Sequence, residues 1–342
     1  MDVHHGSPIM DPFVQYVVEG VVGPALVAAL VAAVCALHRG VVWPFKRRSA
    51  EIEGMLGLAM MLAFTLSFLS EREINTILRQ VMTIEGDDMP TERWHRLGLT
   101  ALILALGAPL LALLRDRLPK RFASTVSAGA CVLVAILVGV FVEFPNSPIW
   151  WRVAQGALVV ASTAAYALAA RDVALWSAWI CFAVLAVLAE RSGFASMALM
   201  CGATSAAAFA SAAVFAIAPR LKSGVERVPI GGALALVLGA LSSVVASCGR
   251  AYDSTGVSPW MWVCAPLLPV GGALLFRFTR KAQTPLRGRL WRLAGVAFLA
   301  GGLLVAIALK YAGGSGDEND PYAAAAAAAA ASTHAPIEYL RL

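Results

Sequence analysis

Charged residues at the borders of long apolar segments are the candidates for chemistry in this sequence. Five of them stand out by position: Glu19, Glu143, Arg152, Glu190 and Arg191. They are expected on the same side of a membrane as three further polar residues, His95, Arg250 and Asp253. If these side chains converged, they would form a polar pocket able to hold a lipid head group or to perform acid–base chemistry. Ordinary solvated loop charge explains the same pattern more simply, and we favour it.

Glu19 is the candidate placed deepest within an apolar run. It precedes Gly20, Gly23 and Pro24, where a kink with freed backbone groups is expected. A carboxylate at this depth is costly unless it is paired or hydrated, so it is a candidate for function. The structural alternative, which is the more common, is an acid that reaches the interface or pairs with a neighbouring arginine.

The sequence contains no recognisable catalytic or metal-binding motif. It lacks G-x-S-x-G, H-E-x-x-H and a phosphate-binding glycine loop, and its five histidines are scattered. No spacing among the acids resembles a metal site. We therefore expect neither a cofactor nor a metal, and the catalytic residues, if any, are unknown.

The composition indicates a membrane protein. Hydrophobic residues make up 59% of the 342 residues and charged residues only 14%, whereas soluble domains have roughly 45–50% and about 25%. The net charge of +6 lies mostly in loops between apolar runs, without an aromatic–basic face, so nucleic acid is not expected as a partner. Membrane lipids, and possible further membrane subunits, are the expected partners.

Ten apolar segments are long enough to be considered as membrane spans. They are 14–37, 54–69, 97–114, 123–143, 153–170, 173–189, 194–218, 229–247, 259–276 and 293–311. The division between the fifth and sixth is the weakest, since only Arg171 and Asp172 separate them, but 153–189 is too long for one span. The predicted fold class is thus all-α, a polytopic transmembrane bundle of about ten spans.

The basic residues predict the topology of this bundle. Alternate loops carry 18 of the 27 lysines and arginines, and they are 38–51, 115–121, 171–172, 219–228 and 277–292. Because basic loops stay cytoplasmic, both termini are expected outside. The preference for Arg over Lys and the abundance of Ala suggest a GC-rich bacterial gene and therefore the plasma (inner) membrane.

Two segments are predicted outside the spans. Residues 71–84 have apolar residues at helical spacing after a capping box, Ser70 with Glu73, and predict an amphipathic helix on the outer surface. Residues 313–342 combine an acidic Gly/Ser linker with nine alanines and predict a disordered external tail. The bundle itself is expected to form one domain, residues 1–312.

Small residues predict close packing of the seventh and eighth spans. Gly231, Ala235, Gly239, Ser243 and Ser247 recur every four residues in the eighth, and Ala198, Gly202, Ala206 and Ala210 do so in the seventh. The two spans are expected to form a central pair, in which Gly239→Leu should force the backbones apart and Gly239→Ala should be much milder. On the fifth span, Gln155, Ser162, Thr163 and Tyr166 share one side, which is typical of interhelical hydrogen bonding and less often of a substrate path.

Six cysteines are present, and four of them are expected to be core residues. Cys248 and Cys264 flank one outer loop, where a disulfide is conceivable although not favoured.

Three function classes fit this sequence. The favoured one is a non-catalytic membrane component, such as a subunit of a larger assembly. The second is a transporter or flippase for an uncharged or lipid substrate. The third is a membrane-embedded enzyme that acts on a lipid-linked substrate at the outer face.

Overall fold

The computed structural model describes residues 18–38, 44–70, 94–142, 144, 148–169, 173–221, 231–272, 274 and 285–312. The predicted surface helix 71–84 and the predicted tail 313–342 lie outside this part of the chain. Two compact units are formed, residues 1–301 and 302–342. The described residues contain no β-strand, so the all-α prediction is confirmed.

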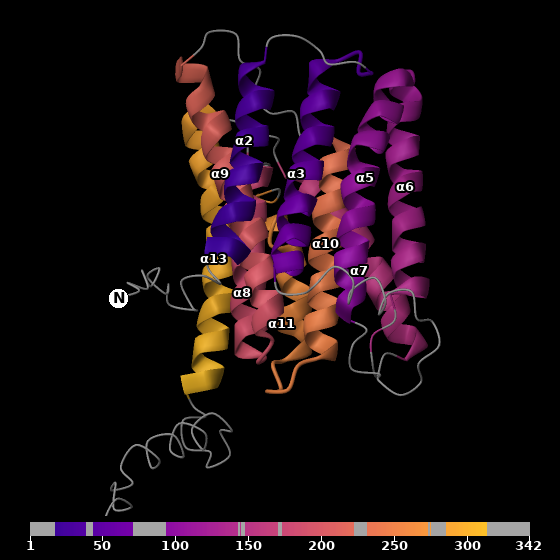
Figure 1. The fold of residues 1–342 in the computed structure, drawn as a ribbon. Coiled ribbons are helices and arrows are strands. Elements are labelled where there is room, and N and C mark those ends of the chain that lie inside the picture. Colours follow the sequence, from indigo (N-terminus) through magenta and orange to yellow (C-terminus); the bar gives the residue numbers. More distant parts are fainter. Residues whose placement is uncertain are drawn as a thin grey trace, which may run out of the picture. The chain divides into compact units, whose positions relative to one another are not determined.

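Helices account for nearly all of the described chain (Figure 1). Their bounds are η1 Val18–Val22 (a π-helix), α2 Gly23–Leu37, α3 Arg48–Ser70, α5 Arg96–Arg117, α6 Lys120–Phe141, α7 Ile149–Leu168, α8 Ala174–Arg191, α9 Ala195–Leu221, α10 Gly232–Ala251, α11 Pro259–Cys264, η3 Ala265–Leu267 (a 3₁₀ helix) and α13 Pro285–Ala312. Eight of the described helices are long and apolar enough to cross a membrane, namely α2, α3, α5, α6, α8, α9, α10 and α13. The chain is a polytopic, multi-pass membrane protein.

α7 and α8 are separate helices on either side of the predicted division between the fifth and sixth spans, and of the two only α8 is among the eight helices that could cross a membrane. The predicted kink near Gly20 corresponds to a local change of helix type: η1 continues into α2, with Pro24 in the first turn of α2.

The prediction of a continuous ninth span, 259–276, is wrong over its described part. The chain forms only the six-residue α11 and then η3 before it turns at Leu268 and Pro269. Pro266 and Pro269 explain the break, because each lacks an N–H and its ring crowds the preceding turn. The broken backbone is covered by protein: the Cys181 thiol of α8, for example, donates to the Ala265 carbonyl oxygen at 3.3 Å.

α10 is the most enclosed of the apolar helices, with 89% of its span buried, whereas only 17% of α6 is buried. α10 packs mainly against α7 and α5, and α9 packs mainly against α8, α2 and α3. The predicted pairing of the seventh and eighth spans is therefore wrong. A small-residue ladder shows which face of a helix comes close to a neighbour, but it does not show which neighbour that is.

Gly239 of α10 lies directly against the backbone of α7. A Cβ atom at this position would be 2.5 Å from the Thr163 nitrogen and 2.6 Å from the Thr163 Cα. Both distances are shorter than packed carbon contacts allow, so even alanine requires α7 and α10 to move apart. Alanine is therefore expected to lower stability as well, although less than leucine.

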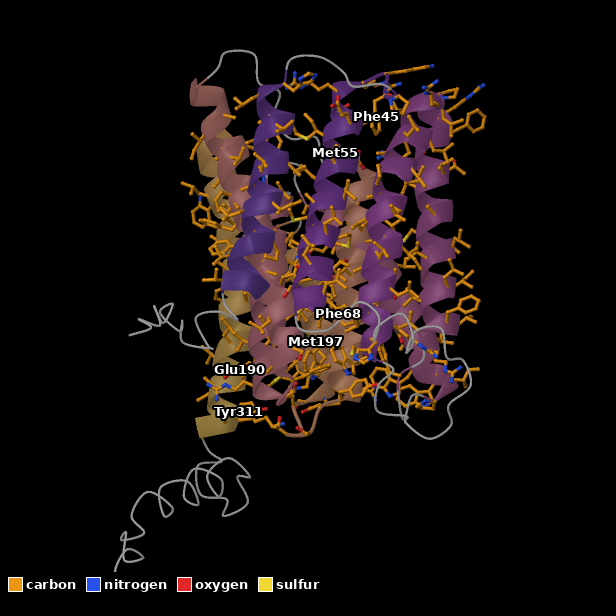
Figure 2. All side chains as sticks on the ribbon, in the orientation of Figure 1. Phe45, Met55, Phe68, Glu190, Met197 and Tyr311 are labelled. Atoms are coloured by element: carbon orange, nitrogen blue, oxygen red, sulfur yellow. The ribbon has the colours of Figure 1, made fainter. Side chains whose placement is uncertain are left out.

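The residues of unit 1–301 form two polar ends separated by the apolar length of the helices. In Figure 2, Phe45 and Met55 lie toward one end and Phe68 and Met197 toward the other. We call the first the Glu53 end and the second the Trp94 end. The described parts of the basic loops 38–51 and 115–121 lie together at the Glu53 end, where their residues contact one another.

Candidate functional site

Glu53 is the centre of a buried ion pair at the Glu53 end. The residue is 5% exposed, and its carboxylate oxygens lie 2.8 and 3.0 Å from Arg115 Nη1. Oε1 also accepts hydrogen bonds from the backbone N–H groups of Ala233 and Leu234, the latter at 3.2 Å. One carboxylate on α3 thus binds α5 and the first turn of α10.

The position of Glu53 suits the electrostatics of a helix terminus. The first N–H groups of a helix have no intrahelical acceptor, and the N-terminus of the helix carries partial positive charge. Gly231, the residue that precedes α10, has no side-chain acceptor to cap the helix. Glu53 supplies that acceptor from another helix, and Arg115 neutralises the remaining charge.

Asp116, the neighbour of Arg115, performs a similar role for the loop before α3. It is 4% exposed and accepts hydrogen bonds from the backbone N–H groups of Lys46 and Arg47, the latter at 3.0 Å. The Arg47 side chain approaches it at 3.4 Å. The loop that enters α3 is therefore fixed to the end of α5.

Two further arginines bind carbonyl oxygens at this end. Arg48 Nη2 donates to the carbonyl oxygens of Cys35 and Ala36, at 3.1 and 3.2 Å, and so caps the end of α2. Arg117 Nη2 donates to the Pro44 carbonyl oxygen at 2.7 Å. Cations favour the negative end of a helix dipole, so the Arg48 bonds stabilise the end of α2, whereas the Arg117 bond holds the loop that precedes α3.

The importance of Glu53 was not predicted from the sequence. The second span was expected to begin at 54, which left Glu53 between the basic loop 38–51 and that span, but α3 begins six residues earlier, at Arg48. The missed signal is the run Glu51-Ile52-Glu53, which places acids within the first turns of an apolar helix. An acid in that position needs a partner, although the sequence does not identify Arg115 and α10 as the partners.

The five residues predicted as candidates are placed as follows. The backbone of Glu19 lies in η1, but its side chain is outside the described part of the structure, as is the whole of Glu143. Arg152 lines a groove between α6 and α7. Glu190 and Arg191 form an ion pair at 3.7 Å with side chains that are 66% and 53% exposed. Such solvated pairs contribute little to stability.

His95, Arg250 and Asp253 were expected on the same side of the membrane as these five candidates. In the structure each of them makes contacts that hold the fold. His95 is 2% exposed and lies among aromatic rings, with centroids 4.3 Å from Trp94 and 5.9 Å from Phe68. Arg250 lies over the Trp151 ring, 3.2 Å from its centroid. Asp253 accepts hydrogen bonds from the N–H and hydroxyl groups of Thr255, which holds the turn before α11.

A chain of aromatic side chains connects several segments at the Trp94 end. Trp94 contacts Phe194 at 5.2 Å between centroids, Phe194 contacts Tyr252 at 5.8 Å, and Tyr252 contacts Phe144 at 6.3 Å. The first and third of these contacts are edge-to-face and the second is tilted, and such aromatic pairs are favourable beyond their buried area. This end is therefore held together by packed rings, whereas the Glu53 end is held by ions.

The predicted interhelical hydrogen bonding of the fifth span is confirmed at Ser162. Its hydroxyl donates to the Gly239 carbonyl oxygen at 2.8 Å and lies 2.6 Å from the Ser243 hydroxyl on α10. Gln155 lies about two helical turns from Ser162, toward the Trp94 end. It lines a pocket of about 290 Å³ between α7, α10 and the broken segment 259–267. The polar side of α7 thus serves mainly to bind α10.

Two further expectations concern metals and cysteines. Among the described residues, no group of three or more His, Cys, Asp or Glu side chains is placed to hold a metal ion. All six cysteines have free thiols, so Cys248 and Cys264 do not form a disulfide in this structure.

Comparison of the chain with protein-family models, with curated proteins and with solved structures gives no match.

Proposed function

We propose that this integral membrane protein is a non-catalytic membrane component, in the manner of a subunit or scaffold of a larger assembly. The observation that supports the proposal is the use made of the buried charges in the described part. Glu53 binds two other helices, and Asp116 fixes a loop. Their cationic partners, Arg115 and Arg47, take part in these same contacts. Side chains that are already engaged in contacts between parts of their own protein are poorly placed to bind or transform a substrate.

The same proposal assigns the orientation and the location. The Glu53 end carries basic loops and would face the cytoplasm, which places both termini outside. A plasma or inner membrane, with lipids and other membrane subunits as partners, follows from this reading. The predicted candidates Glu19, Glu143, Arg152, Glu190 and Arg191 would then lie at or near the outer face.

A flippase for a lipid substrate is the second candidate. Two observations favour it. The groove between α6 and α7 is large and lined almost entirely by apolar residues, and the segment 259–272 is a broken helix next to a pocket with polar residues. Transporters often use interrupted helices at their substrate sites.

A lipid-scrambling assay distinguishes these two functions. The full chain is reconstituted into liposomes that contain a fluorescent phospholipid, and dithionite is added to bleach the outer leaflet. A non-catalytic component leaves the inner-leaflet fluorescence protected, as in protein-free liposomes. Loss of inner-leaflet fluorescence in proportion to the amount of protein would contradict our proposal. If Ala157→Phe in the α6/α7 groove suppressed that loss of fluorescence, the flippase function would be established.

A further inference from the structure

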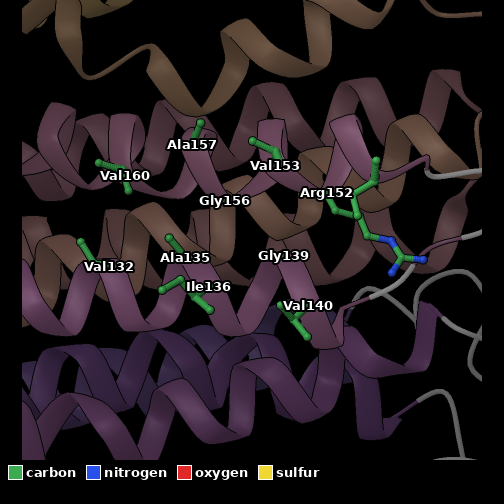
Figure 3. A pocket seen from close by; sticks show the side chains of 11 residues that line it. Val132, Ala135, Ile136, Gly139, Val140, Arg152, Val153, Gly156, Ala157 and Val160 are labelled. Carbon is green, nitrogen blue, oxygen red and sulfur yellow. The ribbon is translucent and has the colours of Figure 1, made fainter.

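The groove between α6 and α7 has apolar walls and a single charged residue among those that line it. Its volume is about 520 Å³. Val132, Ile136 and Val140 line it from α6, and Val153, Ala157 and Val160 line it from α7. Figure 3 shows Arg152 at one end of the groove, next to Val140 and Val153 and far from Val132 and Val160.

Close contact of the two backbones forms the floor of the groove. A Cβ atom at Gly139 would lie 3.0 Å from the Arg152 carbonyl oxygen, and one at Gly156 would lie 3.0 Å from the Ala135 carbonyl oxygen. The glycines let α6 and α7 approach each other there, as small residues do between membrane helices. The larger side chains stand on the two walls and leave the space between them open.

The walls of the groove face the surroundings of the bundle and not its core. The exposed fractions of Ile136, Val140 and Val153 are 56%, 57% and 68%. α6 is one of the helices suited to cross a membrane, so its exposed wall would face the hydrocarbon of the lipid, and the wall from α7 borders the same groove. From Val132 to Val140 the groove extends about 12 Å along the helix axis, which approaches the ~15 Å depth of one leaflet's hydrocarbon.

The charged end of the groove complements a phosphate. Arg152 carries a guanidinium group, which binds phosphate oxygens through paired hydrogen bonds. A second arginine, Arg96, donates to the Phe141 carbonyl oxygen at 3.2 Å at the end of α6 and adds positive charge to the same region. Trp150 and Trp151 precede Arg152 in the first turn of α7, and tryptophan favours the depth of lipid head groups.

We propose that this groove binds one anionic phospholipid of the surrounding leaflet. One acyl chain lies between the valines of α6 and α7, and the phosphate is bound by Arg152. This site does not depend on the proposed function, because a bound lipid is compatible with a scaffold and with a flippase. The scrambling assay measures movement of lipid between leaflets, whereas this proposal concerns binding at equilibrium.

Native mass spectrometry of the purified full chain in detergent tests the site. With added phosphatidylglycerol, we expect a one-to-one adduct that survives detergent removal, and a much weaker adduct with phosphatidylcholine, whose head group has no net charge. Arg152→Gln should weaken phosphatidylglycerol binding about tenfold, the effect of losing a charge-assisted hydrogen bond, and Arg152→Lys should weaken it less. Ala157→Phe should remove the adduct by filling the exposed groove.

Matched substitutions elsewhere serve as controls. Arg191→Gln removes an exposed arginine outside the groove, and Ile103→Phe adds a ring on the exposed face of α5, where Ile103 is 60% exposed. Both should bind phosphatidylglycerol as the unchanged chain does. Equal binding by Arg152→Gln and the unchanged chain, equal adducts with the two lipids, or an equal loss in the control variants would overturn the proposal.

Discussion

Replacing Glu53 with alanine is expected to lower the free energy of unfolding by about 3–5 kcal/mol, the cost of breaking a buried ion pair by removal of one partner. The change leaves the Arg115 guanidinium without its carboxylate, and it leaves the N–H groups of Ala233 and Leu234 without an acceptor. Thermal unfolding in detergent can be followed with a thiol-reactive dye, because five of the six cysteines are buried and react only after unfolding.

Exchanging the two charges should not restore stability. In the double variant Glu53→Arg/Arg115→Glu the pair is retained in reverse, but a cation then faces the positive N-terminus of α10. A simple ion pair would be rescued by this exchange, so recovery would show that the bonds to α10 are unimportant. Glu190→Ala, which breaks an exposed pair, is the control and should cost no more than about 1 kcal/mol.

Gly239→Ala is expected to destabilise the bundle by about 1–3 kcal/mol, as overpacking of a tight core does. The added Cβ would lie 2.5–2.7 Å from the nitrogen, Cα and Oγ1 of Thr163. Since two of these atoms belong to the backbone, α7 must shift as a whole. Gly239→Leu should cost more than alanine does, because it adds a branched side chain at the same contact.

Gly107→Ala and Gly129→Ala are the matched controls for this prediction. Both glycines lie within membrane-spanning helices, α5 and α6, and a Cβ atom at either would meet nothing within 4 Å. Alanine at these positions should be neutral or slightly stabilising, because it reduces the conformational freedom of the unfolded chain. If Gly239→Ala matched these controls in the thiol-dye assay, the close contact of α7 with α10 would be disproved.

The sequence predicts the elements of this fold better than their arrangement. Apolar length and basic loops predicted the long helices and the separation of α7 from α8, because these depend on local composition. The prediction of the ninth span failed at Pro266 and Pro269, because the effect of these prolines on the backbone outweighs the hydrophobicity of the segment. The neighbours of α10 could not be predicted, since Gly239 marks a close contact without identifying Thr163 as its partner.

The partners of the buried ion pair could not be predicted from the sequence either. Glu53 and Arg115 are 62 residues apart, and Ala233 follows 118 residues after Arg115. Nothing in the local sequence pattern connects these residues. The basic residues around Glu53 were explained by the tendency of basic loops to stay cytoplasmic, so they did not indicate an ion pair. The candidate residues were chosen because they border apolar runs, whereas the buried pair of Glu53 and Arg115 lies at the opposite end from Glu190.

Buried charge joins the helices of this bundle, and the bond from Glu53 to the first turn of α10 is the contact in which this can be measured. Hydrogen exchange of the full chain in lipid nanodiscs, read by mass spectrometry over 231–240, measures this bond. The first N–H groups of a helix normally exchange fast for want of an acceptor. We predict slow exchange at Ala233 and Leu234, and a return to fast exchange at these two amides in Glu53→Ala while the middle of α10 stays protected. Fast exchange at both amides in the unchanged chain, or exchange unaltered by Glu53→Ala, would show that Glu53 does not bind the first turn of α10.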